Sequence, residues 1–363
     1  MSHALVSVWK RYGMRAIALR DINLEIRPRE FLVIYGPAGA GKSTMLNILA
    51  GITQPTSGDV TRDGASILGV PPERRNAAMA FENYALYSHL SVFDNLAFPL
   101  RARRLPETAI ASQVQSIAEM MGIAHVLSRR PGFLSGGQRQ RVALARAIVR
   151  PADLYLLDEP IGHLDAKLRH KVRPELKALA QDRASTVVFT TTSSREALAL
   201  GDRIAVFNQG RLLQVGTPAE IYHQPVDTFV ATFVGDPPMS LIAARAEQEG
   251  EALLMKLPDG SSLGAVSRPL DTRSADLKIG FRSSDITLGD PQAPGSITGV
   301  VETVEQLGYS VIVLAGTASE QVSITTPFNS RLRPGETVGL RFAPNALHVF
   351  ASDKAIYHAA GEH

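Results

Sequence analysis

A phosphate-binding loop between Phe31 and Ala50 constrains the fold of this chain more than any other feature. The apolar run Phe31 to Tyr35 is typical of a buried strand, and the loop after it matches the pattern G-x-x-x-x-G-K-[ST] in full. Glycines let successive backbone N–H groups curl around phosphate oxygens, and the helix that begins inside the loop directs its positive end at the same oxygens. The residues expected to form this site are Gly36, Pro37, Ala38, Gly39, Ala40, Gly41, Lys42, Ser43 and Thr44.

Two side chains of the loop have separate expected roles in binding a nucleoside triphosphate. Lys42 is expected to reach the β- and γ-phosphates, and Ser43 is expected to ligate Mg²⁺. An acidic pair, Asp158 and Glu159, closes the continuous apolar run Leu154 to Leu157. Buried strands that end in such pairs place a Mg²⁺ ligand and a water-activating base beside a phosphate loop. We therefore expect Asp158 to bind the metal and Glu159 to act as the base.

A second phosphate-binding helix end is predicted at residues 134–141, which read LSGGQRQR. Ser135 can cap the helix that follows, and Gly136 and Gly137 leave its first N–H groups accessible to an anion. The chain therefore holds two anion-binding helix ends that lie far apart in the sequence.

Tyr12, beside Gly13, is an aromatic residue just ahead of the nucleotide-binding region. Such a ring can stack on adenine, a contact worth about 1–3 kcal/mol by analogy with base stacking in nucleic-acid complexes. A tyrosine half-buried at the edge of a sheet explains the same residue equally well, so both interpretations stay open.

The pattern of predicted elements divides the chain into two domains. Residues 1–235 predict an α/β domain, with helical stretches between about 83 and 150. Beyond Val234 to Pro238 the helices give way to short alternating strands separated by Gly, Pro and Asp. Evenly spaced short strands favour a small all-β barrel or sandwich of the OB type over residues 236–363. A length of 363 residues also favours two domains over one.

The composition limits the possible partners and locations. With 38 basic and 35 acidic residues the formal net charge is +3, spread along the chain, which favours a mildly basic surface over nucleic-acid binding. The absence of cysteine excludes disulfides and cysteine metal sites, and it is compatible with the cytosol. We find no signal peptide and no apolar run long enough for a membrane span. Any membrane association is therefore expected to come through partner subunits.

The ordered set of motifs resembles the ATP-binding subunits of ABC transporters over residues 1 to about 235. This set comprises Tyr12, the GPAGAGKST loop, Tyr84-Ala85-Leu86-Tyr87, LSGGQRQR, LLDEP and Leu164-Asp165. The tail resembles the OB-like domain of importer ATPases for carbohydrates and polyols, such as the maltose and glycerol-3-phosphate systems. Its landmarks are Gly280-Phe281-Arg282, Val304 to Gly308 and Leu347 to Phe350.

The resemblance implies a P-loop ATPase that pairs head to tail with a second ATPase subunit and sandwiches ATP and Mg²⁺ between them. Lys42 would contact phosphate, Ser43 and Asp158 would serve Mg²⁺, and Glu159 would be the general base. Tyr12 would stack on adenine. The helix end of the neighbouring subunit would embrace the γ-phosphate through Ser135, Gly136, Gly137 and Gln138.

The same resemblance implies a place in a larger assembly. Two transmembrane permease subunits would dock near Glu82 to Tyr87, at the cytoplasmic face of the inner or plasma membrane, and a substrate-binding protein would act indirectly. The transported solute would be a sugar, a polyol such as glycerol, or a glycerol phosphate. The OB-like domain would regulate the subunit or enlarge its dimer interface.

Three positions depart from the family pattern. Glu82 stands where the family has Gln, Thr192 where it has the His that holds the γ-phosphate and attacking water, and Gly162-His163 where it has Ser-Asn. Glu82 keeps an oxygen that can reach Mg²⁺, so Glu82 and Thr192 remain candidate catalytic residues beside Lys42 and Glu159. Losing one transition-state stabiliser typically costs about 10²–10³ in rate.

The departures predict that this chain is the impaired half of an asymmetric pair, whose other chain has intact Gln and His. The alternatives are a slow homodimer in which His163 compensates or the residues have drifted, a mostly non-hydrolysing regulatory partner, and a soluble ABC-type factor outside transport. The last class usually carries two ATP cassettes or a long coiled coil, and neither is present in this sequence.

Overall fold

The computed structural model describes residues 1–14, 16–162, 164–181, 184–249, 252–257, 260–266, 277–317, 320–343 and 346–359. The chain divides into two compact units, Met1–Pro218 and Ala219–His363. This division lies earlier than the predicted boundary at residue 235, because the short helices α7 (Pro218–His223) and α8 (Thr228–Phe233) pack with strands of the second unit. In the described part of the chain, no helix combines the length and hydrophobicity that crossing a bilayer requires.

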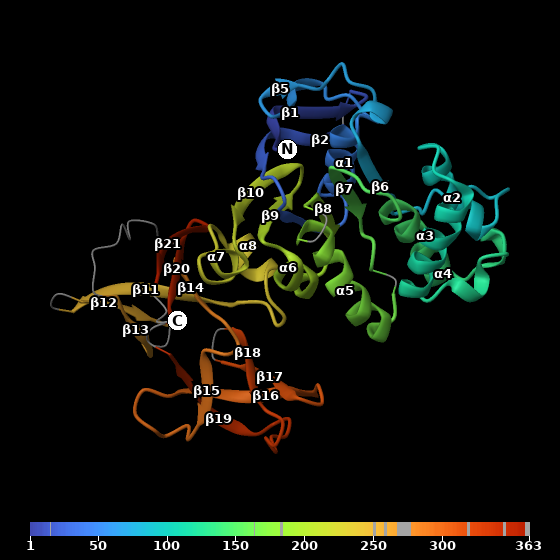
Figure 1. Ribbon diagram of the computed structural model, residues 1–363. Coiled ribbons are helices and arrows are strands. Elements are labelled where there is room, and N and C mark those ends of the chain that lie inside the picture. Colours follow the sequence, from blue (N-terminus) through green and yellow to red (C-terminus); the bar gives the residue numbers. More distant parts are fainter. Residues whose placement is uncertain are drawn as a thin grey trace. The chain divides into compact units, whose positions relative to one another are not determined.

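A six-stranded sheet forms the centre of the first unit (Figure 1). Its strands, in spatial order, are β10 (Arg211–Gly216), β9 (Arg203–Asn208), β3 (Phe31–Tyr35), β8 (Thr186–Thr191), β7 (Leu154–Asp158) and β6 (Ala77–Ala80). All pairs are parallel except β10 with β9. The strands β3, β7 and β8 are buried at every residue, as expected of parallel strands covered on both faces. The loops after β3, β6, β7 and β8 therefore meet at one edge of the sheet.

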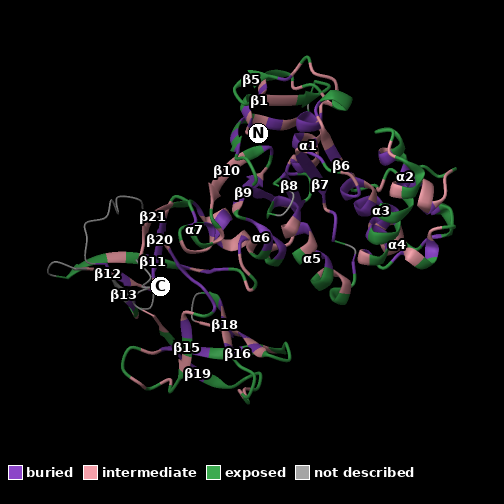
Figure 2. Ribbon diagram, viewed as in Figure 1, coloured by how far each residue is buried: buried purple, intermediate pink, exposed green. Residues whose placement is uncertain are grey.

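A second, antiparallel sheet covers the phosphate-loop helix. It consists of β2 (Ala16–Ile26), β1 (His3–Tyr12), β4 (Ser57–Arg62) and β5 (Ala65–Ser66), in that order. Helix α1 (Lys42–Ala50) lies between the two sheets, because its apolar residues share one core with both. Figure 2 shows this core as buried residues in β1, β7 and α1. Packing on both sides fixes the helix whose first turn carries the phosphate loop.

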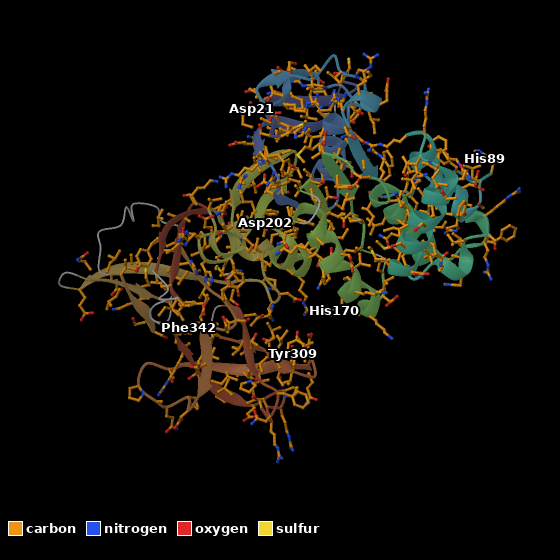
Figure 3. All side chains as sticks on the ribbon, viewed as in Figure 1. Asp21, His89, His170, Asp202, Tyr309 and Phe342 are labelled. Carbon is orange, nitrogen blue, oxygen red and sulfur yellow. The ribbon has the colours of Figure 1, made fainter. Side chains whose placement is uncertain are left out.

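The remaining helices of this unit are short or amphipathic. Helices α2 (Val92–Arg101), α3 (Glu107–Met120) and α4 (Gly136–Ile148) pack together in the stretch where helices were predicted, as Figure 1 shows. Single 3₁₀ turns occur at Pro72–Arg74, Ala124–Val126 and Pro131–Phe133. Helices α5 (Ala166–Gln181) and α6 (Ser194–Leu200) contact β8. Asp202, labelled in Figure 3, accepts a hydrogen bond of 2.9 Å from the Phe31 N–H and ties the start of β9 to β3.

The second unit is built from two antiparallel sheets. One sheet has the order β13 (Ser262–Val266), β12 (Ala252–Lys256), β11 (Ser240–Glu249), β14 (Leu277–Phe281), β20 (His348–Ala351) and β21 (Lys354–His358). The other has the order β15 (Ile286–Gly289), β19 (Thr337–Phe342), β16 (Ile297–Gln306), β17 (Ser310–Gly316) and β18 (Gln321–Pro327). Their inner faces share one apolar core, in which the rings of Phe281 and Phe342 lie 4.6 Å apart. The predicted fold class, a P-loop α/β unit followed by an all-β unit, is confirmed.

Candidate nucleotide-binding site

A cavity of about 430 Å³ opens at the edge of the six-stranded sheet where the parallel strands end. It brings together the phosphate loop with the loops after β6, β7 and β8, which are far apart in the sequence. The residues lining it are Ala18, Ala38, Gly39, Ala40, Gly41, Lys42, Ser43, Thr44, Glu82, Glu159, Gly162 and Thr192. Most of the residues predicted for phosphate contact and catalysis therefore lie in one place.

The shape of the phosphate loop requires glycine at two positions. Gly41 has φ +103°, in the left-handed region, and a Cβ there would overlap the carbonyl oxygen of Ala18. A Cβ on Gly36 would overlap the carbonyl oxygen of Phe207 in β9. The loop is thus pressed against two neighbouring strands, which fixes the path of its backbone along the cavity.

Lys42 is almost fully buried and holds the loop together. Its ammonium donates hydrogen bonds to the carbonyl oxygens of Gly36 and Pro37, at 2.9 and 3.1 Å, and forms an ion pair of 3.4 Å with Glu159. Gly36 and Pro37 do not line the cavity; they act on it by positioning this ammonium. A single cation therefore faces both the phosphate loop and the predicted base.

Glu159 is held in an unusual backbone conformation. Its φ of +46° is rare for a residue with a side chain and typically costs about 1–3 kcal/mol. Two buried partners fix this turn: the Glu159 N–H donates to the Thr190 hydroxyl at 3.0 Å, and the Gln140 amide donates to the Glu159 carbonyl oxygen at 2.9 Å. The strain aims the carboxylate back toward Lys42, where the two side chains pair.

The chemistry of the Glu159 carboxyl is set by opposing effects. Burial raises its pKa above the usual value, while Lys42 and the Thr192 N–H, which donates to the carboxylate, act to lower it. A carboxylate that gains proton affinity through burial is suited to accept a proton from water. Thr192, predicted from sequence as a replacement for histidine, thus contacts the predicted base through its backbone.

Ser43 and Asp158 have the donor chemistry that a magnesium nucleotide needs. Asp158 is buried directly beside Glu159, and one of its carboxylate oxygens accepts a hydrogen bond of 2.7 Å from the Thr190 hydroxyl. Ser43 lines the cavity and its hydroxyl forms no hydrogen bond within the described residues. Mg²⁺ is commonly held by one or two such oxygens together with substrate phosphates, so these residues fit it. No cluster of three or more acidic or histidine side chains occurs in the described residues, so the phosphates would supply the other ligands.

The two residues predicted to depart from the family pattern line the same cavity. Glu82, after β6, and Thr192, after β8, are both exposed. Gly162 also lines it, and a Cβ at Gly162 would lie 3.8 Å from a Glu159 carboxylate oxygen. No histidine lines the cavity within the described residues, and His163 lies outside them. The cavity thus has two carboxylates and one cation.

A buried ion-pair network, not predicted from the sequence, joins the loops after β7 and β8. Glu196 in α6 accepts a hydrogen bond of 2.7 Å from the Thr191 hydroxyl and pairs with Arg169 at 3.7 Å. Arg169 also donates to the Leu164 carbonyl oxygen at 2.9 Å. This network connects the residue before Thr192 to the Leu164-Asp165 turn. In the sequence, this network is indicated only by one acidic residue in an otherwise apolar helix face and by one arginine four residues after Asp165. Both features are common in proteins, so they could not single out the network.

Tyr12 does not line the cavity. It ends β1 with 47% of its surface exposed, and the Lys10 ammonium lies 5.0 Å from the centre of its ring. The ring is about half exposed, but it stands at the end of a strand that pairs on both sides, with β2 and β4, and not on an edge strand. Its stacking on adenine stays a prediction.

The second helix end, at residues 135–138, also lies outside this cavity. Ser135 is exposed and caps α4 through a capping box: its hydroxyl accepts from the Gln138 N–H at 3.2 Å, and the Gln138 side chain accepts from the Ser135 N–H at 3.0 Å. The sequence predicted this cap. Gln140 in the same helix reaches the Glu159 backbone, so α4 contacts the loop after β7 although its tip at residues 135–138 does not line the cavity.

A groove of about 510 Å³ lies beside the Glu82 to Tyr87 segment, between β6, α2 and α4. Tyr87 and Phe98 line it, both substantially exposed, with their rings 4.9 Å apart. The Arg146 guanidinium lies 5.0 Å over the Tyr87 ring and donates to the carbonyl oxygens of Tyr84 and Ala85. Exposed aromatic residues in a groove are typical of protein-binding surfaces.

Comparison with known families agrees with these two units. The family described as ABC transporter matches residues 19–162, and the family described as TOBE domain matches residues 279–350. The first match includes the phosphate loop, the LSGGQRQR segment and Glu159. The second covers the whole five-stranded sheet of the C-terminal unit and most of strands β14 and β20 of its six-stranded sheet.

Two characterised relatives align over nearly the whole chain. The trehalose/maltose import ATP-binding protein MalK of Thermococcus litoralis is 40% identical, with 97% of this chain and 99% of the relative covered. The sn-glycerol-3-phosphate import ATP-binding protein UgpC of Psychromonas ingrahamii is 39% identical, with 96% and 93% covered. Among solved structures, a dimeric ATP-binding cassette in a post-hydrolysis state bound to ADP and Pi is 30% identical. It has a TM-score of 0.56 and covers 60% of this chain and 98% of its own.

Proposed function

Because this chain belongs to the ATP-binding subunits of ABC transporters, of the type found in sugar and glycerol-phosphate importers, we propose that it hydrolyses ATP to drive solute import. The solute we propose is a small polar one: a sugar, a polyol such as glycerol, or a glycerol phosphate. The observation that carries the proposal is the cavity in which Lys42 and Glu159 pair beside the phosphate loop.

The phosphate loop and Lys42 bind the triphosphate. The N–H groups of the loop and of the start of α1 donate hydrogen bonds to the phosphate oxygens, and Lys42 moves its contact from Glu159 to the β- and γ-phosphates. Ser43 and Asp158 would hold Mg²⁺, with Glu82 as a further candidate ligand, and the ion would supply positive charge to neutralise the phosphate oxygens.

Glu159 acts as the general base. Its carboxylate accepts the proton of the attacking water, and the Thr192 N–H fixes its direction. Because Lys42 lowers the pKa of Glu159, the transfer of Lys42 to phosphate removes that effect and leaves burial to raise the proton affinity. Substrate binding thus strengthens the base.

A second subunit completes the pocket. The exposed tip of α4 at Ser135 to Gln138 contacts no part of its own cavity, and we propose that it closes on the γ-phosphate bound by a partner. The groove with Tyr87 and Phe98 receives a permease subunit, which places the chain at the cytoplasmic face of the membrane. A substrate-binding protein acts through the permeases.

We propose further that this chain is the impaired half of an asymmetric pair. The described wall of its cavity lacks an imidazole, and Glu82 adds negative charge beside the triphosphate. Its α4 tip is intact, with a complete capping box. Paired with a related chain that has Gln and His, it would complete one fast pocket and contribute one slow pocket.

To test the asymmetric pair, phosphate release is measured for the purified chain alone and for the chain mixed with a related subunit that has Gln and His at the matching positions. We expect the mixture to be much faster. In the chain alone, Thr192→His should raise the rate, by up to about 10²–10³-fold if the imidazole restores one transition-state stabiliser. In the mixture, Thr192→His should raise the rate of phosphate release far less, because the pocket built on the partner's phosphate loop already accounts for most of the turnover.

Two results would contradict the proposals separately. Equal turnover by the homodimer and the mixture would remove the asymmetric pair but leave the ATPase. Phosphate release that stays at background in both, and that Glu159→Gln does not reduce, would remove the ATPase itself.

A further inference from the structure

A second cavity of about 430 Å³ lies in the C-terminal unit, where the five-stranded sheet has its two edges. The edges are β15 and β18, which lie close together because the sheet curls. This cavity belongs entirely to the second unit and takes no part in the nucleotide chemistry.

The cavity exists because the curled sheet is joined at one end only. Just before β15, the Ser283 carbonyl oxygen accepts a hydrogen bond of 2.9 Å from the Thr325 N–H, and the two hydroxyls lie 2.8 Å apart. Beyond this point the described residues of β15 and β18 form no hydrogen bond with each other. The gap is flanked by the loop that follows β18.

The wall of the cavity has an apolar part and a polar part. Ile286 and Leu288 of β15 and Leu332 of the loop supply the apolar part. Thr326, Ser330 and Arg331 supply hydroxyl groups and a guanidinium. No carboxylate from the described residues lines the cavity, so Arg331 gives its wall a positive charge.

These polar groups are not occupied by other contacts. The Thr326 hydroxyl is buried without a hydrogen-bond partner, and Thr326 is only 8% exposed. Within the described residues, the Ser330 hydroxyl and the Arg331 guanidinium form no hydrogen bond or ion pair. A buried hydroxyl without a partner is uncommon in folded proteins and destabilises them, so the Thr326 hydroxyl in this cavity points to a ligand. Ser330 and Arg331, which are more exposed, are available to contact the same ligand.

We propose that this cavity binds a small hydroxylated organic anion, such as a phosphorylated or carboxylated polyol. Arg331 contacts the anionic group through the fork of its guanidinium, which matches phosphate and carboxylate oxygens. Ser330 and Thr326 contact the ligand hydroxyls, and the carbon skeleton lies against Ile286 and Leu288. The volume is within the range of small-molecule sites. The ligand bridges the open edges of the sheet, so its binding stabilises this unit.

The test is isothermal titration of the full chain with sn-glycerol 3-phosphate, in the presence of saturating ADP and Mg²⁺ to occupy the phosphate loop. Glycerate is titrated as the carboxylated form of the ligand. Glycerol and inorganic phosphate are titrated separately as the two parts of glycerol 3-phosphate. We expect binding of glycerol 3-phosphate, glycerate or both, with each half alone much weaker.

Two variants locate the binding. Arg331→Gln should weaken binding about 10- to 100-fold, the range expected for the loss of a charged hydrogen-bonding partner. Arg333→Gln is the matched control, because Arg333 is exposed in the same loop, does not line the cavity and carries the same charge. Thr326→Val keeps the side-chain shape, and it should weaken binding while raising the melting temperature of the free chain.

Three results would overturn the proposal. The first is no binding of either organic anion at millimolar concentration. The second is binding that Arg331→Gln and Arg333→Gln weaken equally or not at all. The third is inorganic phosphate binding as tightly as glycerol 3-phosphate, which would reduce the site to a surface oxyanion contact. Each is independent of the proposed ATPase, because the phosphate loop is occupied throughout.

Discussion

Two buried cations, one in each unit, both donate to backbone carbonyl oxygens, but only Lys42 also pairs with a carboxylate. Lys42, 6% exposed, faces a cavity and pairs with the carboxylate of Glu159. Arg282, 2% exposed, donates to the carbonyl oxygens of Tyr222, Ala231 and Val234 and stacks on the Tyr222 ring. Burial lowers the pKa of Arg282 to about 10.

The difference separates a chemical role from a structural one. An ion pair at the wall of a cavity can be exchanged for a ligand, because a phosphate replaces the carboxylate as the partner of the lysine. A guanidinium surrounded by backbone carbonyls has no such replacement, and its loss leaves those carbonyls buried without donors. Arg282 thereby holds α7 and α8 against β14, which explains why the structure groups residues 219–235 with the second unit.

The largest expected effect comes from removing the exchangeable cation. Lys42→Met should lower ATP hydrolysis by at least about 10²–10³-fold, because it removes charge stabilisation of the transferring phosphoryl group. Steady-state phosphate release, measured with the partner that gives the higher rate, checks this. Lys171→Met, at an exposed position of α5, is the control and should stay near the unmodified rate. Equal losses in both variants would contradict the role of Lys42.

Removing the structural cation should affect stability instead. We expect Arg282→Met to lower the free energy of unfolding of the C-terminal unit by about 2–4 kcal/mol, because three carbonyl oxygens lose a buried donor. Denaturant unfolding followed by circular dichroism measures this. Arg245→Met, at an exposed position of β11, should change stability little. If Arg282→Met unfolds like the Arg245 variant, the contrast between the two cations is wrong.

A histidine near Arg282 should make this unit sensitive to acid. Burial, with His358, Arg282 and His223 nearby, lowers the pKa of His348 to about 3, while the unfolded chain binds that proton near pH 6.5. Stability is therefore full above pH 6.5 and is lost as the pH falls toward 3, by about 2 kcal/mol at pH 5.

The measurement is the pH dependence of the free energy of unfolding between pH 7 and pH 5. His348→Gln should flatten this dependence, since the folded and unfolded forms of the variant bind no proton at this position. His89→Gln is the control, at an exposed histidine labelled in Figure 3. A slope that His348→Gln leaves unchanged would show that the buried histidine does not cause the acid sensitivity.

The smallest effect is expected from the cation that joins two loops of the nucleotide site. Arg169→Gln breaks the contacts to Glu196 and Leu164, and it should raise the activation free energy of hydrolysis by about 0.5–2 kcal/mol. Because Arg169 does not line the cavity, we expect the loss in kcat rather than in KM for ATP. Lys167→Gln, two residues earlier in α5 and exposed, is the control. A change confined to KM would contradict a positioning role.

Much of the architecture could be predicted because local patterns determine it. The strand Phe31 to Tyr35 has the predicted bounds, and helices α2, α3 and α4 lie within the predicted helical stretch of about 83 to 150. The Ser135 cap also formed as expected, because an N-cap and a residue three positions later satisfy each other locally. The partners of Glu159 could not be predicted, since Thr190 and Gln140 reach it only after α4 and β8 pack around β7.

The sequence by itself determined the kind of ligand at the first cavity, because a phosphate loop is a property of consecutive backbone N–H groups and needs only its own residues in order. The tertiary structure alone decided that Lys42 pairs with Glu159, that Arg169 joins two loops and that a second cavity opens between β15 and β18. These contacts join residues distant along the chain. Their geometry depends on how sheets twist and helices pack, which no local pattern encodes.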